Sequence, residues 1–273
     1  MTLVVLGSVK GAPGTTTAAL ALAFAWPLAA GQRVLVVDAD PAGADLASGF
    51  LQGAAPAGGG LAAAAASRED VATVVVAGSV ALDGTGARLL LTGAAATRHR
   101  GAGPMWARLR ELPRAGWVVL VDAGRVTADD AQQMVTSADA VLLVSGSSLR
   151  AAAAARPIAT TLHPGDDAAR GGMAAVRLLV VGERRPYRVD ELASSLGMPA
   201  LPPLAWDPRA ASVLSDGARA SGRFARTALM RSAAATARAL YDELTRTQAS
   251  PESAGAAPVA QVNGNATGLG ARR

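Results

Sequence analysis

Short apolar runs recur along the chain, separated by alanine-rich stretches of helical character. The runs are rich in valine and leucine, as buried strands are. Strands that alternate with helices form the repeating unit of a parallel sheet. The pattern therefore predicts an α/β fold, in which a mostly parallel, twisted sheet is flanked by helices on both faces. We expect its strands at 3–6, 33–38, 71–76, 88–92, 117–122, 140–144 and 176–181.

The alanine-rich stretches predict helices between these strands and after the last of them. We expect helices at 18–26, from near Leu61, at 104–112, from near Leu149 and at 223–247. The last one has an apolar stripe at helical spacing, formed by Leu229, Met230, Ala233, Ala237, Leu240, Tyr241 and Leu244. We therefore expect this helix to dock on the sheet, with Arg231 and Arg238 facing water.

Composition limits the class of protein. Of the 273 residues, 51% are hydrophobic and 17% are charged, which is enough for one α/β core that we place at 1–248. Residues 249–273 have no apolar periodicity and predict a disordered tail. The chain has no cysteine, which excludes disulfides and thiolate metal sites and favours a cytoplasmic location. We expect neither a signal peptide nor a transmembrane helix, because no apolar stretch reaches the roughly 20 residues that span a bilayer.

A glycine-rich segment at 7–17 joins the first predicted strand to the first predicted helix. Backbone N–H groups in such a loop, with the positive end of the helix dipole, form a site for phosphate. The usual phosphate loop reads G-x-x-x-x-G-K-[ST], and Thr15 stands where that pattern has lysine. Lys10 is the one lysine in the chain, beside 25 arginines. The alternative interpretation of Lys10 is a surface lysine in a glycine turn.

Residues 10–17 resemble the deviant phosphate loop of the ParA/MinD family of ATPases, K-G-G-x-G-K-T-T. The family's signature lysine is present as Lys10, and its ordinary loop lysine is replaced by Thr15. The resemblance implies a SIMIBI-like P-loop NTPase fold, ATP and Mg²⁺ as cofactors, and an ATP-dependent homodimer in which Lys10 reaches the partner's phosphates as a catalytic residue. The nucleotide-binding residues that it implies are Lys10, Gly11, Ala12, Pro13, Gly14, Thr15, Thr16 and Thr17.

Three aspartates, Asp38, Asp40 and Asp45, follow the second predicted strand. Carboxylates at the carboxyl end of a strand beside a phosphate loop suit Mg²⁺ binding and the positioning of water. A turn is the alternative, since Asp, Pro and Gly also form loops. The ParA/MinD family carries D-x-D-P here, so the resemblance assigns Asp40 to orienting the attacking water. Asp38 and Asp45 are then candidate magnesium or switch residues.

A second aspartate signal ends the apolar run at 117–122. Four apolar residues that run into an aspartate have the form of a Walker B strand, whose carboxylate, here Asp122, holds the Mg²⁺ hydration shell opposite a loop hydroxyl, here Thr16. The segment 122–124 stands where the family has its second switch, although the prolines of that switch are absent. The expected magnesium site is therefore Thr16 and Asp122, with water between the carboxylate and the ion.

The sequence contains few signals for the part of the site that would bind the nucleotide base. Many relatives end the strand at 176–181 in Asn-Arg, whereas this chain continues with Gly182 and Glu183, so base specificity has no support beyond an acceptor at Glu183. The segment 199–205 resembles the family's last strand, and Trp206 begins the loop that follows it. Trp206 either stacks on the base or belongs to the core, and we take the core as the interpretation.

Members of the family are ATP-switched dimers that position plasmids, chromosomes, division sites or pili. The resemblance implies a slowly hydrolysing, dimeric ATP switch in partitioning or cellular positioning, most similar to the actinobacterial ParA-like and TadZ/CpaE-like group. Thr15 invites an alternative, because a hydroxyl cannot neutralise charge on phosphate as lysine does. That alternative is a non-catalytic nucleotide-binding scaffold that localises a pilus, secretion or division apparatus.

Charge is distributed unevenly. Residues 1–145 carry 10 basic and 11 acidic side chains, net −1, whereas residues 146–273 carry 16 and 10, net +6. A cationic surface without base readout agrees with non-specific DNA binding, and a protein cargo on the same face is the alternative. No basic amphipathic helix ends the chain, so we expect no membrane anchor. The candidate DNA contacts are Arg219, Arg223, Arg226, Arg231 and Arg238.

Overall fold

The computed structural model describes residues 2–9, 14–40, 46–54, 60–92, 107–162 and 174–249. Within these ranges seven strands form one sheet, in the order β3-β4-β2-β5-β1-β6-β7. All neighbouring pairs are parallel except β3 and β4. The strands are β1 (Thr2–Ser8), β2 (Arg33–Asp38), β3 (Val80–Ala81), β4 (Arg88–Leu91), β5 (Trp117–Arg125), β6 (Ala140–Gly146) and β7 (Ala175–Val181). The predicted α/β fold with a mostly parallel sheet is confirmed.

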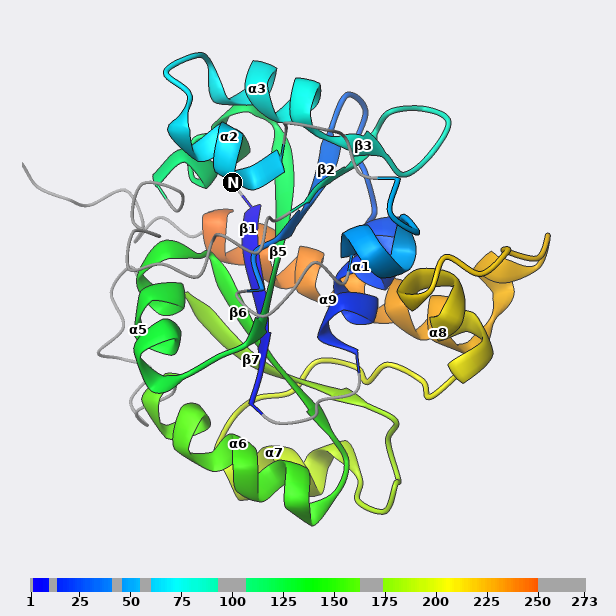
Figure 1. Cartoon of the computed structure of the whole chain (residues 1–273). Coiled ribbons are helices and arrows are strands. Elements are labelled where there is room, and N and C mark those ends of the chain that lie inside the picture. Colours follow the sequence, from blue (N-terminus) through cyan, green and yellow to red (C-terminus); the bar gives the residue numbers. More distant parts are fainter. Residues whose placement is uncertain are drawn as a thin grey trace, which may run out of the picture.

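Helices cover both faces of this sheet (Figure 1). One face carries α2 (Gly60–Ala66), α3 (Val71–Gly78), α5 (Ala128–Ser137), α6 (Leu149–Leu162) and α7 (Val189–Leu196). The other carries α1 (Thr15–Ala25), α8 (Pro208–Ser215) and α9 (Ala228–Ala249), with the one-turn helices η1 (Leu46–Phe50) and η5 (Phe224–Arg226) on the same side.

Alternate residues of each central strand enter opposite layers of the core, because successive side chains of a strand point to opposite faces. In β1, Leu3 and Val5 pack in the layer beneath α5 and α6, whereas Val4 and Leu6 pack beneath α1. All four are at most 2% exposed. Burial on both faces explains why these strands read as continuous apolar runs.

The strand predicted at 71–76 is wrong, because this segment is helix α3. The Asp70 carboxylate caps the helix by accepting a hydrogen bond from the Thr73 N–H (2.9 Å). Val71 and Val75, four residues apart, are both buried and face the core. A side-chain cap and an apolar stripe thus outweigh the preference of β-branched residues for strands.

The strand expected at 199–205 is also absent as a regular strand. Only two isolated bridges join this segment to β7, Leu178 with Ala200 and Val181 with Leu204. Pro202 and Pro203 lie between the bridges and lack the N–H donors that a sheet ladder needs. The segment is therefore extended along β7 but makes a broken ladder.

The last helix carries the predicted stripe. The residues of that stripe are buried, apart from the half-buried Tyr241, and α9 packs on α1 within the layer that covers the sheet. Arg231 and Arg238 are exposed, as expected. The helix begins at Ala228 rather than 223, and residues 250–273, nearly all of the predicted tail, lie outside the described residues. Among the helices that the structure describes, none is both long and apolar enough to traverse a bilayer.

Candidate functional site

The site is built where the carboxyl ends of three neighbouring strands meet. β5 lies between β1 and β2 and is parallel to both, so the three strands end at the same edge of the sheet. Asp38 at the end of β2 is in register with Asp122 of β5. α1 begins at this edge, and ligands of parallel α/β sheets bind in such places.

The first turn of α1 is open to an anion. Its N-terminal residue Gly14 adopts a left-handed conformation (φ 79°, ψ 51°), and no side chain caps the helix. The Gly14 carbonyl already accepts from the Ala18 N–H (2.7 Å), and a Cβ at Gly14 would lie 3.1 Å from the Cβ of Thr17. The N–H groups of this first turn therefore fit a phosphate group.

A polar cavity of about 520 Å³ surrounds this helix terminus. It brings together the predicted residues Gly14, Thr15, Thr16, Thr17 and Asp40. Lys10, Gly11, Ala12, Pro13 and Asp45, also predicted, lie outside the described residues. The described lining consists of Ser8, Gly14, Thr15, Thr16, Thr17, Asp40, Ser48, Gly49, Gly124, Arg125, Ser215 and Asp216.

Asp40 packs directly on the backbone of the strand beside it. Gly124 has a left-handed φ of 60°, and a Cβ there would lie 2.0 Å from the carboxyl carbon of Asp40. Only glycine permits this approach. The Gly124 N–H donates to Asp122 Oδ1 (3.0 Å), and its carbonyl accepts from the Ser8 hydroxyl (3.3 Å). Gly124 thus links the ends of β1 and β5 while leaving room for the Asp40 carboxylate.

The aspartates of β2 and β5 that pair in register are both buried. Asp38 is 2% exposed and Asp122 is 1% exposed, and neither lines the cavity, whereas Thr16 does. A hydroxyl at the cavity wall with a buried carboxylate behind it suits Mg²⁺ held through water and phosphate oxygens. Over the described part of the chain, His, Cys, Asp and Glu form no group of three that could hold a metal ion.

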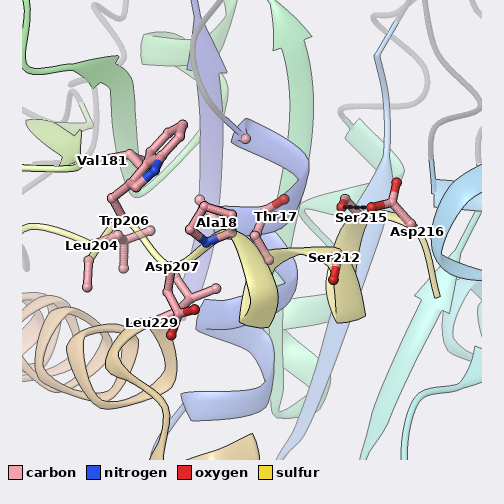
Figure 2. Close-up of a pocket in the computed structure, with 14 residues that line it drawn as sticks. Thr17, Ala18, Val181, Leu204, Trp206, Asp207, Ser212, Ser215, Asp216 and Leu229 are labelled. Atoms are coloured by element: carbon pink, nitrogen blue, oxygen red, sulfur yellow. Dashed lines mark hydrogen bonds between the residues drawn. The ribbon is translucent and has the colours of Figure 1, made fainter. Parts of the chain in front are cut away.

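An apolar cavity of about 250 Å³ adjoins the polar one and shares Gly14, Thr17, Ser215 and Asp216 with it. Figure 2 shows Trp206 and Val181 on one side of the first turn of α1, and Ser215, whose hydroxyl donates to Asp216, on the other. The remaining lining residues are Ala18, Leu204, Ala205, Asp207, Pro208, Ala211, Ser212 and Leu229. A flat apolar group fits this cavity.

Trp206 is not a core residue, so that interpretation was wrong. Its side chain is 46% exposed, and the Arg185 guanidinium lies 4.9 Å from its ring centre. The next residue, Asp207, caps α8 by accepting a hydrogen bond from the Ala210 N–H (3.1 Å). Glu183 does not line either of the two cavities.

Sequence reasoning missed the wall that η1 and α8 contribute. A Cβ at Gly49 would lie 2.1 Å from the carbonyl oxygen of Ser215, and the Gln52 amide donates to the Asp216 carbonyl (3.1 Å). These contacts join segments about 165 residues apart, and no local pattern announces them. Arg125 was also missed, although it directly follows the predicted second switch and a count of charges near that switch would have found it.

Solved structures share this architecture, although no protein-family model and no curated protein sequence matches the chain. A chain of the MinC:MinD cell division complex from Aquifex aeolicus is 17% identical, with a TM-score of 0.67 over 89% of this chain and 96% of that one. The ParA family ATPase from Chlorobium tepidum is 16% identical, with a TM-score of 0.66 over 87% of this chain and 99% of that one.

The chain has the ParA/MinD fold. A third structure with this fold, the septum site-determining protein MinD from Pyrococcus horikoshii complexed with Mg-ADP, is 14% identical, with a TM-score of 0.58 over 90% of this chain and 98% of that one. The similarity extends over nearly the whole length of each of these structures.

Proposed function

We propose that this protein is an ATP-binding switch of the ParA/MinD type, which hydrolyses ATP slowly and positions a cellular cargo. The observation that carries the proposal is the pair of adjoining cavities at the N-terminus of α1, one polar and one apolar. A nucleotide likewise has a polar part, the phosphates, and a flat, mostly apolar part, the base. A site with this division matches a nucleoside triphosphate better than a small anion or an apolar ligand.

The polar cavity takes the phosphates. The uncapped N–H groups of Thr15, Thr16 and Thr17 offer donors, and the dipole of α1 favours negative charge at this end. The Thr16 hydroxyl and, through water, the buried Asp122 would hold a Mg²⁺ ion, which would supply positive charge to the phosphates. Asp38 of β2 is in register with Asp122 of β5 and is a further candidate residue for the magnesium site.

The apolar cavity takes the base. Leu204, Pro208 and Ala211 form its walls, and the exposed Trp206 ring, with Arg185 on it, stands at its mouth. Aromatic and aliphatic walls hold a flat heterocycle through area burial and ring contacts. ATP is supported as the nucleotide by the similarity to a MinD structure complexed with Mg-ADP.

Asp40 orients water for hydrolysis. Its carboxylate lines the polar cavity and is held against Gly124. A carboxylate that accepts from water directs the oxygen lone pair towards the reacting phosphorus, which is the main contribution that a protein makes to such a reaction besides stabilising charge.

The alternative is a scaffold that binds ATP without hydrolysing it. Thr15 favours this alternative, because loss of a positive group at the phosphates costs on the order of 10²–10³ in rate, whereas binding through backbone N–H groups survives. Such a scaffold would localise a pilus, secretion or division apparatus.

One experiment separates the two functions. The full chain is titrated calorimetrically with ATP and Mg²⁺, and phosphate release is followed on the same sample. Binding with turnover supports the switch, and binding without turnover selects the scaffold. Absence of binding refutes both. Thr15→Lys restores the usual loop lysine and should raise ATP affinity.

The active form that we propose is an ATP-dependent homodimer in the cytoplasm. Lys10 then reaches the partner's phosphates, as the resemblance implies. Sedimentation with and without ATP tests this, since Lys10→Ala should keep ATP binding but lose the dimer. An unchanged sedimentation profile for Lys10→Ala would remove the interface role.

We propose non-specific DNA as a partner of the ATP form, and a protein cargo as the alternative. The candidate DNA contacts are five arginines. Arg226 is the last residue of η5, and Arg223 directly precedes that helix. Arg231 and Arg238 lie on α9, and Arg219 lies before η5. If phosphates drive binding, affinity falls linearly with salt on a logarithmic scale. No retardation of random duplex at low salt with ATP and Mg²⁺ would point to the protein cargo.

A further inference from the structure

Arg125 is the one cation among the described residues that line the polar cavity. The same lining contains two acidic side chains, Asp40 and Asp216, and Asp38 and Asp122 are buried nearby at the ends of the neighbouring strands β2 and β5. A nucleotide that carries several negative charges needs a positive group here besides Mg²⁺.

A break in the β1–β5 register places Arg125 at the start of the glycine-rich loop. Leu6 pairs with Asp122, but Ser8 pairs with Arg125, so one residue of β1 faces two residues of β5. The Val126 N–H donates to the Ser8 carbonyl (2.8 Å) and fixes the new register. Strand bulges of this kind re-aim side chains beside active sites.

The side chain of Arg125 is exposed, while its neighbours Ala123 and Val126 are buried. Three other arginines, Arg88, Arg177 and Arg188, each form an ion pair with a carboxylate. Within the described ranges, Arg125 forms none. Its guanidinium is therefore not held by the fold and remains available to a ligand.

We propose that Arg125 supplies, within the same subunit, the positive charge that Thr15 no longer provides to the β- and γ-phosphates. The inference rests on the proposed function and names the ligand group more closely. A guanidinium stays charged at every physiological pH and donates two parallel hydrogen bonds to phosphate oxygens. Arg125 thus selects nucleoside di- and triphosphates over monophosphates, and it does so in the monomer, before any residue of a second subunit takes part.

The test uses calorimetric titrations of the full chain with ATP, ADP and AMP in the presence of Mg²⁺. Arg125→Ala should weaken ATP binding about 10- to 100-fold, the effect of losing hydrogen bonds to a charged group, and should change AMP binding less than twofold. Arg125→Lys should recover part of the lost ATP affinity, because the lysine ammonium keeps the positive charge but lacks the two parallel donors of the guanidinium. Arg114→Ala is the matched control, since Arg114 is an equally exposed arginine near the other end of β5.

A second measurement uses Thr15→Lys in both backgrounds. If the two positions supply the same charge, Thr15→Lys should raise ATP affinity more in the Arg125→Ala protein than in the wild type, a coupling that a double-mutant cycle measures. Thermal melting of each variant shows whether it folds.

Equal ATP affinity of wild type and Arg125→Ala would overturn the inference while leaving the proposed function intact. Equal weakening of ATP and AMP would also overturn it, because Arg125 would then act on the fold and not on the outer phosphates. A wild type that binds no nucleotide would instead refute the proposed function, and the inference with it.

Discussion

The two ends of β5 carry similar residues in different settings. At the amino end, the exposed Arg114 and the left-handed Gly116 precede Trp117. At the carboxyl end, Gly124 is also left-handed and Arg125 is also exposed. Space around Gly116 is open, whereas Gly124 touches the Asp40 carboxylate. The amino end therefore uses glycine to turn the chain, and the carboxyl end uses it to build a site.

Tryptophan–arginine pairs repeat the contrast at the two edges of the sheet. At the amino edge, Trp117 is 5% exposed and Arg33 lies 5.4 Å from its ring centre. At the carboxyl edge, Trp206 is 46% exposed beneath Arg185. The same pair of side chains stabilises the core in one place and borders a cavity in the other. Residue type alone thus does not separate the core position from the position at the cavity, whereas the exposed fraction of the two tryptophans does.

The largest effect is expected from the carboxylate at the carboxyl edge. Asp40→Asn keeps the size of the side chain but removes the negative charge that we propose orients water, so turnover should fall about 10²- to 10⁴-fold. The matched change is Asp139→Asn at the amino edge, where the carboxylate accepts from the Leu3 N–H (2.7 Å) and turnover should stay unchanged. Phosphate release measures both. Equal turnover for Asp40→Asn and the wild type would make Asp40 a turn residue.

The two tryptophans should separate stability from affinity. Trp117→Ala removes a buried ring and should lower the free energy of unfolding by about 3–5 kcal/mol, with ATP affinity unchanged wherever the protein is folded. Trp206→Ala should lower it by less than about 1 kcal/mol, because that ring is half exposed, and should weaken ATP binding several-fold. Urea denaturation and calorimetry provide the two readouts, and the opposite pattern would refute the base site.

The two glycines should differ as well. Gly124→Ala forces a Cβ into the Asp40 carboxylate and a left-handed conformation on alanine, for a cost of about 2–4 kcal/mol in the free energy of unfolding. Gly116→Ala should lower the free energy of unfolding by only about 1–2 kcal/mol, because alanine must adopt the left-handed conformation but meets no clash. Both variants are compared by urea denaturation. A loss at Gly124 no greater than that at Gly116 would show that Asp40 moves away freely.

The smallest effect concerns an ion pair at the amino edge. Burial raises the pKa of Asp83, but hydrogen bonds from Thr85 and Arg88 outweigh it and leave the pKa below its ordinary value of 3.8. Arg88 also donates to the Ala23 carbonyl at the end of α1 (2.9 Å). The pair therefore stabilises the fold above about pH 4 and loses its effect as pH falls through the lowered pKa.

Asp83→Asn measures that effect. At pH 7 the change should cost no more than about 1 kcal/mol, because the pair is near the surface. The difference from the wild type should shrink as pH drops below 3.8 and vanish once Asp83 is protonated in the folded state. A difference that persists at pH 2 would show that the charge of Asp83 is not its cause.

Local patterns predicted most of the sheet. The apolar runs at β1, β2 and β5 need no information beyond their own residues. Thr15–Thr17 and Asp40, named from the loop pattern and the family resemblance, line one cavity in the structure, and their roles stay predictions. The segment at 71–76 was mistaken for a strand, because valine-rich composition hides the helical spacing of Val71 and Val75 and the cap at Asp70.

The rest of the site depends on contacts between distant segments. Ser48, Gly49, Ser215 and Asp216 meet only because η1 packs on the end of α8, and nothing near those residues signals that packing. Trp206 was placed in the core because tryptophan is highly buried on average, yet it is 46% exposed and lines the apolar cavity. Contacts between segments far apart in the sequence therefore determine this part of the site, and local sequence patterns do not indicate them.

We propose that the carboxyl edge of the sheet, and not the amino edge, binds the nucleotide. Hydrogen exchange of the full chain with and without ATP and Mg²⁺ tests it most directly, because amides that contact a ligand exchange more slowly. We expect slower amide exchange at 14–18, 124–126 and 206–216 when ATP is bound, with no change at 112–117. Protection confined to 112–117, or none at 14–18 when calorimetry shows saturation, would contradict it.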